Sequence, residues 1–176
     1  MNSVLLTAGG KRYAFDPWGR ASDWSNIDAV FLTHSHFDHI IGLAGTNAPC
    51  FMDIGDLPVF NASRDYLATL GRKIETMPQD LEVAPKISGM EIIKTPGHSA
   101  GGVCYYFPSE KILLTGDTLF ADTVGRTDLP TGDHEILMRS LALLKSRNFP
   151  SDTLVVPGHA KTATWSEILK NNPYMQ

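Results

Sequence analysis

Cysteine is scarce in this sequence, and basic residues are not in excess. Cys50 and Cys104 are the only cysteines, they stand far apart, and they form no CxxC pair. This spacing argues against a disulfide framework and against a cysteine-rich zinc module. The formal net charge of −4 provides no broad basic surface. We therefore expect neither nucleic acid nor an anionic membrane as a partner.

Long apolar runs are also lacking. No run approaches the roughly 18 residues of a membrane span, and the first 15 residues do not have the charged and apolar regions of a secretion signal. We expect a cytoplasmic protein that acts on a small molecule. Its 176 residues, 43% of them hydrophobic, suit a single domain over residues 1–176, as a monomer or small homo-oligomer.

Short strands predominate in what the sequence does contain. Apolar runs bounded by Gly, Pro or polar turns predict strands at 4–6, 12–15, 29–32, 91–94, 103–107, 111–114 and 153–156, with a glycine turn at 8–11. Helices are predicted at 62–70, with Ser63 near the cap, and at 133–147, where Ile136, Leu137, Leu141 and Leu144 mark one face. Thr164 and Glu167 have the form of a capping box before a last helix. Asp53 and Asp56 are interpreted as solvated loop charges.

The histidines are concentrated just after the predicted strands. In the run HSHFDH, His34 and His36 stand two residues apart, so in extended chain they point to the same side and can bind one ion. Asp38 and His39 follow where the chain turns into a helix, and they face a second position close by. Chance would produce such a motif in about one chain in two thousand of this composition. The motif therefore predicts two neighbouring metal ions.

Three later segments each add one metal-capable side chain. His98 stands in TPGHS, Asp117 in TGDT and His159 in PGH, each in a glycine-containing turn at the end of a predicted strand. Glycine allows a tight bend there, and turns held by strand ends can fix several side chains around one site. The three residues complete a candidate ligand set.

These four motifs, in this order and spacing, resemble the metallo-β-lactamase-fold hydrolases over residues 4–160. The stretch LLTGDTLF followed by VGRTDLP is similar to the glyoxalase II-like, single-domain branch of hydroxyacylglutathione hydrolases. The resemblance implies an α/β fold of the metallo-β-lactamase type, an αββα four-layer sandwich with the site along one edge of two facing sheets. It assigns His34, His36 and His98 to one metal, Asp38, His39 and His159 to the other, and Asp117 to the bridge between them.

The ligand set and the resemblance together indicate a reaction. Imidazole and carboxylate ligands suit two divalent ions, zinc first, with iron or manganese open because no thiolate is among them. Such ions produce a bridging hydroxide that attacks a carbonyl, and Asp38 and Asp117 are the candidate catalytic residues, Asp38 by orienting the hydroxide. A thiolate, whose pKa is about 8.5, leaves without strong acid assistance. We expect hydrolysis of a small thioester such as S-lactoylglutathione, or of a related ester.

Four residues outside the ligand set also have candidate roles, and two of them have alternatives. Arg126 matches a basic position of the glyoxalase II-like loop and could bind a substrate carboxylate or carbonyl; alternatively it pairs with Asp128 or Asp122 and pins the loop. Asp128 is predicted to brace a ligand. Phe37 either lines the substrate pocket or packs against its neighbours. Asp16, before a proline, is interpreted as a structural turn residue.

Two other functions stay open at this point. A persulfide dioxygenase would use one iron held by His34, His98 and Asp117, and the metal stoichiometry would identify it. A non-catalytic metal-binding module would more naturally show gaps in the ligand set. Glyoxalase II itself resembles this chain but adds a C-terminal helical domain with glutathione contacts, whereas 17 residues follow His159 here. Glutathione as the thiol is therefore the open part of the substrate prediction.

Overall fold

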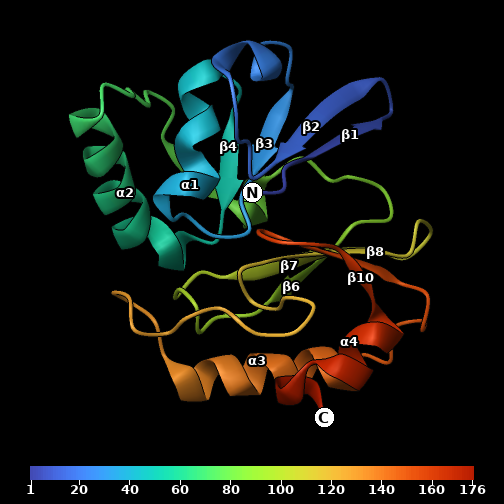
Figure 1. The fold of residues 1–176 in the computed structure, drawn as a ribbon. Coiled ribbons are helices and arrows are strands. Elements are labelled where there is room, and N and C mark those ends of the chain that lie inside the picture. Colours follow the sequence, from blue (N-terminus) through green and yellow to red (C-terminus); the bar gives the residue numbers. More distant parts are fainter. The chain divides into compact units, whose positions relative to one another are not determined.

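The computed structural model describes residues 1–176 with the exception of Ala21 and Ser22. The chain divides into two compact units, residues 1–87 and 88–176, which run from blue to green and from green to red in Figure 1. Each unit is built on one five-stranded sheet with helices along one face. In the part of the chain so described, no helix combines the length and the apolar character needed to cross a membrane.

The first unit has a mostly parallel sheet. Its strands lie in the order β1 (Val4–Ala8), β2 (Lys11–Phe15), β3 (Ala29–Phe31), β4 (Cys50–Met52) and β5 (Pro78–Asp80). β1 and β2 form the predicted antiparallel hairpin, and the pairs from β2 to β5 are parallel. Because parallel strands end at the same edge, the segments that follow β2, β3 and β4 come together there. This edge carries the first group of candidate ligands.

One face of this sheet forms the core of the first unit with α1 (Phe37–Ile40), α2 (Leu57–Thr69) and the turn between α1 and β4. Alternate strand residues point to that face, as the pleat requires. The main buried side chains are Ala14, Val30, Leu32, Cys50 and Met52 from the sheet side and Ile40, Leu43, Phe60 and Leu67 from the helical side. On the other face, Phe31 contacts the rings of Tyr13, Phe15 and Phe51. Burial on both faces explains why β3 is entirely apolar.

The predicted start of the helix at 62–70 was wrong. α2 begins at Leu57, with Pro58 in its first turn, and Ser63 is buried in the helix interior. Proline is tolerated in the first turn because its missing N–H has no partner there in any helix. The strands β4 and β5 are three residues long and were not predicted, since such short runs carry little periodicity.

The second unit has a mostly antiparallel sheet. Its strands lie in the order β10 (Ala163–Thr164), β9 (Leu154–Pro157), β8 (Ile112–Gly116), β7 (Val103–Phe107) and β6 (Glu91–Lys94). All neighbours are antiparallel except β8 and β9, so β6, β8 and β9 run in the same direction. The strands predicted at 91–94, 103–107, 111–114 and 153–156 are confirmed to within two residues. The ends of β6, β8 and β9 lie at one edge, which carries the second group of candidate ligands.

Two helices, α3 (His134–Ser146) and α4 (Trp165–Asn171), cover one face of this sheet (Figure 1). Leu137, Leu141 and Leu144 of α3 are buried in the core that they form with the sheet, as predicted. Ile136, which we placed on the same face, is 38% exposed and does not belong to it. The Asp133 carboxylate accepts a hydrogen bond from Ile136 N at 2.9 Å, so the first turn is fixed with Ile136 facing outward.

The predicted capping box at the start of α4 is confirmed. Thr164 N donates to Glu167 Oε2 at 2.7 Å, and Glu167 N donates to Thr164 Oγ1 at 3.3 Å. Thr164→Ala is expected to lower the free energy of unfolding by about 1 kcal/mol, because it leaves an N–H of the first turn without its acceptor. Urea denaturation followed by circular dichroism measures this change. Glu167→Gln keeps the reciprocal bond and should cost less, so an equal loss in both variants would contradict the capping role.

Candidate metal centre

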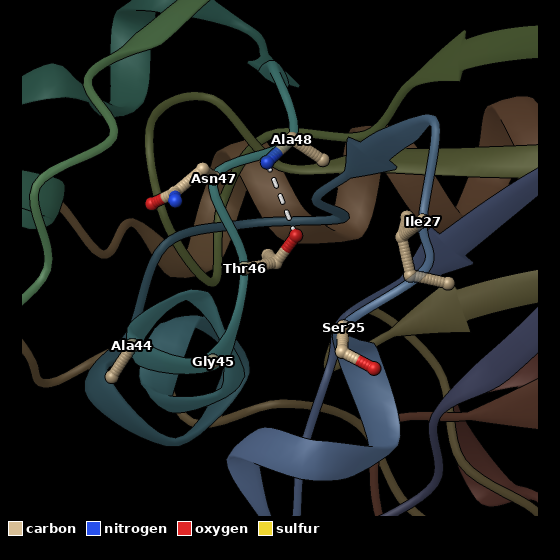
Figure 2. A pocket seen from close by; sticks show the side chains of 7 residues that line it. All are labelled: Ser25, Ile27, Ala44, Gly45, Thr46, Asn47 and Ala48. Atoms are coloured by element: carbon tan, nitrogen blue, oxygen red, sulfur yellow. Dashed lines mark hydrogen bonds between the residues drawn. The ribbon is translucent and has the colours of Figure 1, made fainter.

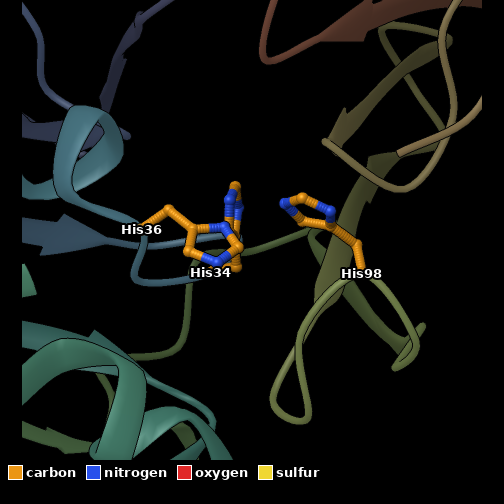
Figure 3. Close-up of side chains that lie close together, drawn as sticks. All are labelled: His34, His36 and His98. Carbon is orange, nitrogen blue, oxygen red and sulfur yellow. The ribbon is translucent and has the colours of Figure 1, made fainter. Parts of the chain in front are cut away.

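Four candidate ligands of the first unit stand on one short segment after β3. His34 follows the strand, His36 is the N-cap of α1, and Asp38 and His39 lie in the single turn of that helix. Figure 3 shows His34 and His36 on this segment. The ring centroid of His34 is 4.8 Å from that of His36 and 3.9 Å from that of His39. Three imidazoles are thus gathered at the end of β3.

Asp16, which directly follows the neighbouring strand β2, contacts this segment through its carboxylate. It is buried, and its carboxylate accepts hydrogen bonds from Thr33 N at 2.8 Å and Thr33 Oγ1 at 2.6 Å. The same carboxylate lies 3.0 Å from Nδ1 of His39. Two lone pairs repel each other at this distance, so the contact favours the tautomer that carries its proton on Nδ1. Nε2 of His39, which lies 4.0 Å from Asp38 Oδ2, is left with its lone pair for a metal.

The Thr33 hydroxyl extends this effect to His34. Its one proton is donated to Asp16, so its contact of 3.2 Å with Nδ1 of His34 requires the imidazole to donate. Nε2 of His34 is then an acceptor as well. We had interpreted Asp16 as a turn residue and had not predicted these contacts. The signal would have been that β2 and β3 are parallel neighbours, whose ends meet.

The interpretation of Asp56 as a solvated charge was wrong. Asp56 is fully buried, and its carboxylate accepts hydrogen bonds from Ser35 N at 2.7 Å and Ser35 Oγ at 2.9 Å. Ser35 stands between His34 and His36, so this carboxylate fixes the backbone that separates two ligands. The cause is again the sheet order, because β4 lies beside β3 and the segment after it reaches the same edge.

In the second unit, His98, Asp117 and His159 follow β6, β8 and β9, and Figure 3 draws His98 on the loop after β6. Oδ2 of Asp117 lies 3.8 Å from Nε2 of His98 and 3.7 Å from Nε2 of His159. Both distances exceed a hydrogen bond. Two ligand atoms that each lie about 2.0–2.1 Å from one ion are at most about 4 Å apart. The two distances from Asp117 are within this limit, so they suit a carboxylate that shares an ion with each imidazole. The donor set of nitrogen and carboxylate oxygen fits divalent transition metals.

The loop after β8 fixes the ring of His98. Nδ1 of His98 lies 2.7 Å from the carbonyl oxygen of Arg126, and a carbonyl only accepts, so Nδ1 donates and Nε2 faces Asp117 with its lone pair. The Arg126 guanidinium pairs with Asp128 through two hydrogen bonds of 2.6 and 2.7 Å, the pairing that we gave as one alternative. These bonds lower the pKa of Asp128 to about 2.

Gly125 is required where this loop passes the two ligands. A Cβ atom on Gly125 would lie 1.9 Å from the carbonyl oxygen of Asp117 and 2.9 Å from Nδ1 of His98. Gly125→Ala is therefore expected to displace both ligands, lowering the free energy of unfolding by about 1–3 kcal/mol and the affinity for zinc about tenfold or more. Thermal denaturation and competition with a chromophoric chelator measure the two changes. A stable variant with the original zinc affinity would contradict the close approach.

Two other features of the first unit, a cavity and the exposed ring of Phe37, lie outside the ligand set. A cavity of about 650 Å³ is lined by Ser25, Ile27 and residues 44–48 (Figure 2). These residues precede β3 and β4, at the opposite end of the strands from His34, and none of them is a histidine, a cysteine or a carboxylate. Phe37 is 44% exposed, and the centroid of its ring lies 5.3 Å from that of the Tyr66 ring. Its contact with a substrate stays a prediction.

Comparison with known proteins agrees with this arrangement. The model of the metallo-beta-lactamase superfamily matches residues 6–46 and 49–159. The probable metallo-hydrolase YqgX of Bacillus subtilis is 32% identical over 99% of this chain and 92% of its own length. The hydroxyacylglutathione hydrolase GloC of Haemophilus influenzae is 28% identical over 85% of this chain and 76% of its own. The solved structure of TTHA1623 in a di-iron-bound form matches with a TM-score of 0.84 and 30% identity, covering 98% of this chain and 94% of that one.

The match extends over all four motifs from which the ligand set was predicted. It confirms the predicted fold class, and proteins of this fold bind divalent metals. YqgX is named as a probable metallo-hydrolase and GloC as a hydroxyacylglutathione hydrolase. By the extent of the family match and the identity to its relatives, this chain belongs to the metallo-β-lactamase superfamily.

Proposed function

We propose that this protein is a dinuclear metal-dependent hydrolase that cleaves a small thioester in the cytoplasm. The observation that carries the proposal is the position of Asp117, whose Oδ2 atom lies nearly equally far from Nε2 of His98 and Nε2 of His159. One carboxylate oxygen between two imidazoles at these distances suits a ligand that bridges two ions.

The proposed ligand set has seven members. His34, His36 and His98 would hold one ion, Asp38, His39 and His159 the other, and Asp117 both. In support, the contacts of Nδ1 in His34, His39 and His98 direct Nε2 of each ring to be the ligand atom. Neither half of the chain supplies a full set by itself, so the proposal requires ligands from both.

Divalent ions held by these residues would supply Lewis acidity and would lower the pKa of a bound water to about 7. The residues of the chain set the charge around that chemistry. The imidazoles would bind as neutral groups, so only Asp38 and Asp117 would offset the positive charge, and the charge that remains would favour negative charge on the oxygen of a substrate carbonyl. Asp38 would accept a hydrogen bond from the attacking water and orient it. The pKa of a thiol, about 8.5, allows a thiolate to leave without strong proton donation.

The choice of a thioester, and of zinc first, rests on similarity and on ligand chemistry. GloC and several relatives from Brucella are hydroxyacylglutathione hydrolases, which makes S-lactoylglutathione the first substrate to test. The ligands suit zinc, iron and manganese, and the di-iron form of TTHA1623 is a specific reason to include iron.

The test combines metal analysis with a hydrolysis assay. The purified protein is expected to contain two equivalents of metal and to hydrolyse S-lactoylglutathione, to lose activity with a chelator, and to regain it with zinc, iron or manganese. His98→Ala should reduce both metal content and turnover, whereas His134→Ala, which removes the histidine at the start of α3, should change neither. A protein with one metal or none, inactive on a panel of acyl thioesters, would contradict the proposal.

A further inference from the structure

We propose that Arg126 and Asp128 act together as positioning residues for His98. Their side-chain pair holds the Arg126 carbonyl where it accepts the Nδ1 proton of His98, so that Nε2 is the atom presented to a metal. This inference rests on the proposed role of His98 as a ligand. It assigns to Arg126 a function through its backbone, whereas the sequence left open a direct substrate contact and a pairing that pins the loop.

The orientation of the His98 imidazole decides which of its nitrogens can bind a metal. A histidine has two ring nitrogens, and a metal can bind either one if the ring is free to turn or to change tautomer. The contact of 2.7 Å between Nδ1 of His98 and the Arg126 carbonyl removes that freedom. The direction of the ring then depends on where the carbonyl lies, and hence on the conformation of the loop.

The side chains of Arg126 and Asp128 form a pair that restrains the loop after β8. Nε and Nη2 of Arg126 bond to the two carboxylate oxygens of Asp128 in a fork, which fixes direction as well as distance. The pair spans two residues and so restrains the backbone on which the carbonyl lies. Its side chains are 62% and 69% exposed, and an exposed pair of this kind adds little to global stability. Its effect is therefore expected to be local.

The whole loop is also attached to the segment that carries His98. Asp133 N, at the end of the loop, donates a hydrogen bond to the carbonyl oxygen of Gly97 at 2.7 Å. Gly125, at its beginning, lies directly against the His98 ring. The loop is thus tied at both ends to the neighbourhood of this ligand, and the Arg126–Asp128 fork restrains the stretch between the two ties.

The two possible roles of Arg126 predict different results for Asp128. If the guanidinium binds substrate, Asp128→Asn leaves it available and Arg126→Gln alone impairs the enzyme through KM. If the pair positions His98, both substitutions release the carbonyl and have the same effect. The double variant should then be no worse than either single one, because all three remove the same restraint.

The experiment compares Arg126→Gln, Asp128→Asn and the double variant with Asp152→Asn. The control breaks the Lys111–Asp152 pair, which has a similar distance of 2.7 Å and a similar exposure in the same unit. Zinc affinity is measured by chelator competition, and the His98 tautomer by long-range ¹⁵N–¹H NMR of the protein as purified. We expect about a tenfold loss of zinc affinity in all three variants, faster exchange of the Nδ1 proton, and no change in the control.

An unchanged Nδ1 signal in both single variants would overturn the inference, and a rise in KM confined to Arg126→Gln would replace it by a substrate contact. Failure of the proposed function has a different signature. In that case the unsubstituted protein binds no zinc, while the NMR comparison still decides whether the pair controls the His98 ring.

Discussion

Asp117→Ala is expected to lower kcat/KM for thioester hydrolysis by about a thousandfold or more and to remove metal from both positions. A single ligand shared by two ions affects both when it is lost, and the loss of their combined charge stabilisation is worth several kcal/mol in the transition state. In the structure, the Asp117 carboxylate is the group that approaches both His98 and His159. Steady-state kinetics and elemental analysis of the same sample measure the two effects together.

The control for this prediction is Asp122→Ala, an exposed carboxylate five residues further along the chain. It should leave metal content and kcat/KM unchanged. If Asp117→Ala lost only one equivalent of metal, the bridge would be the wrong assignment and Asp117 would be a ligand of one ion. Unchanged turnover in that variant would remove Asp117 from the site altogether.

Asp16→Asn is expected to reduce zinc affinity by about 10–100-fold, although Asp16 is not a proposed ligand. Its buried carboxylate accepts from Thr33 and faces Nδ1 of His39, and an amide would present a donor where only acceptors fit. The His39 ring would lose its orientation, and the free energy of unfolding should fall by about 1–3 kcal/mol because buried donors lose their acceptor. Chelator competition and thermal denaturation measure the two changes.

A matched control for Asp16 lies at the other end of the same sheet. The carboxylate of Asp28, just before β3, accepts a hydrogen bond from Arg12 N at 2.8 Å, so Asp28→Asn changes an exposed carboxylate with a backbone N–H partner far along the strand from the ligands. It should leave zinc affinity unchanged. Equal zinc affinity in Asp16→Asn and Asp28→Asn would show that Asp16 serves the turn alone.

The candidate ligands could be found in the sequence because each one lies in a recognisable pattern of a few neighbouring residues. A strand ends, a glycine or a polar run follows, and the metal-capable side chain stands in that turn, as at His34, His98 and His159. Seven of the described strands and the capping box of α4 were predictable for the same reason, since periodicity and caps involve residues a few positions apart. The superfamily follows from the order of these local signals along the chain.

The residues that hold the ligands could not be found in this way. Asp16 and Asp56 reach the ligand segment only because β2 and β4 are the neighbours of β3, and their own surroundings in the sequence indicate a turn and a loop. The Arg126 carbonyl is a backbone group, whose partner no side-chain pattern reveals. Contacts of this kind depend on sheet order and loop path, which pairings distant in sequence determine.

The most direct test of the central claim is anomalous diffraction from crystals of the zinc-loaded protein, measured on both sides of the zinc absorption edge. The account predicts two peaks about 3.5–4 Å apart. Asp117 should lie between them, and the six other proposed ligands should divide between them at bond lengths of about 2.0–2.2 Å. A single peak, or peaks bound by residues outside this set, would contradict it.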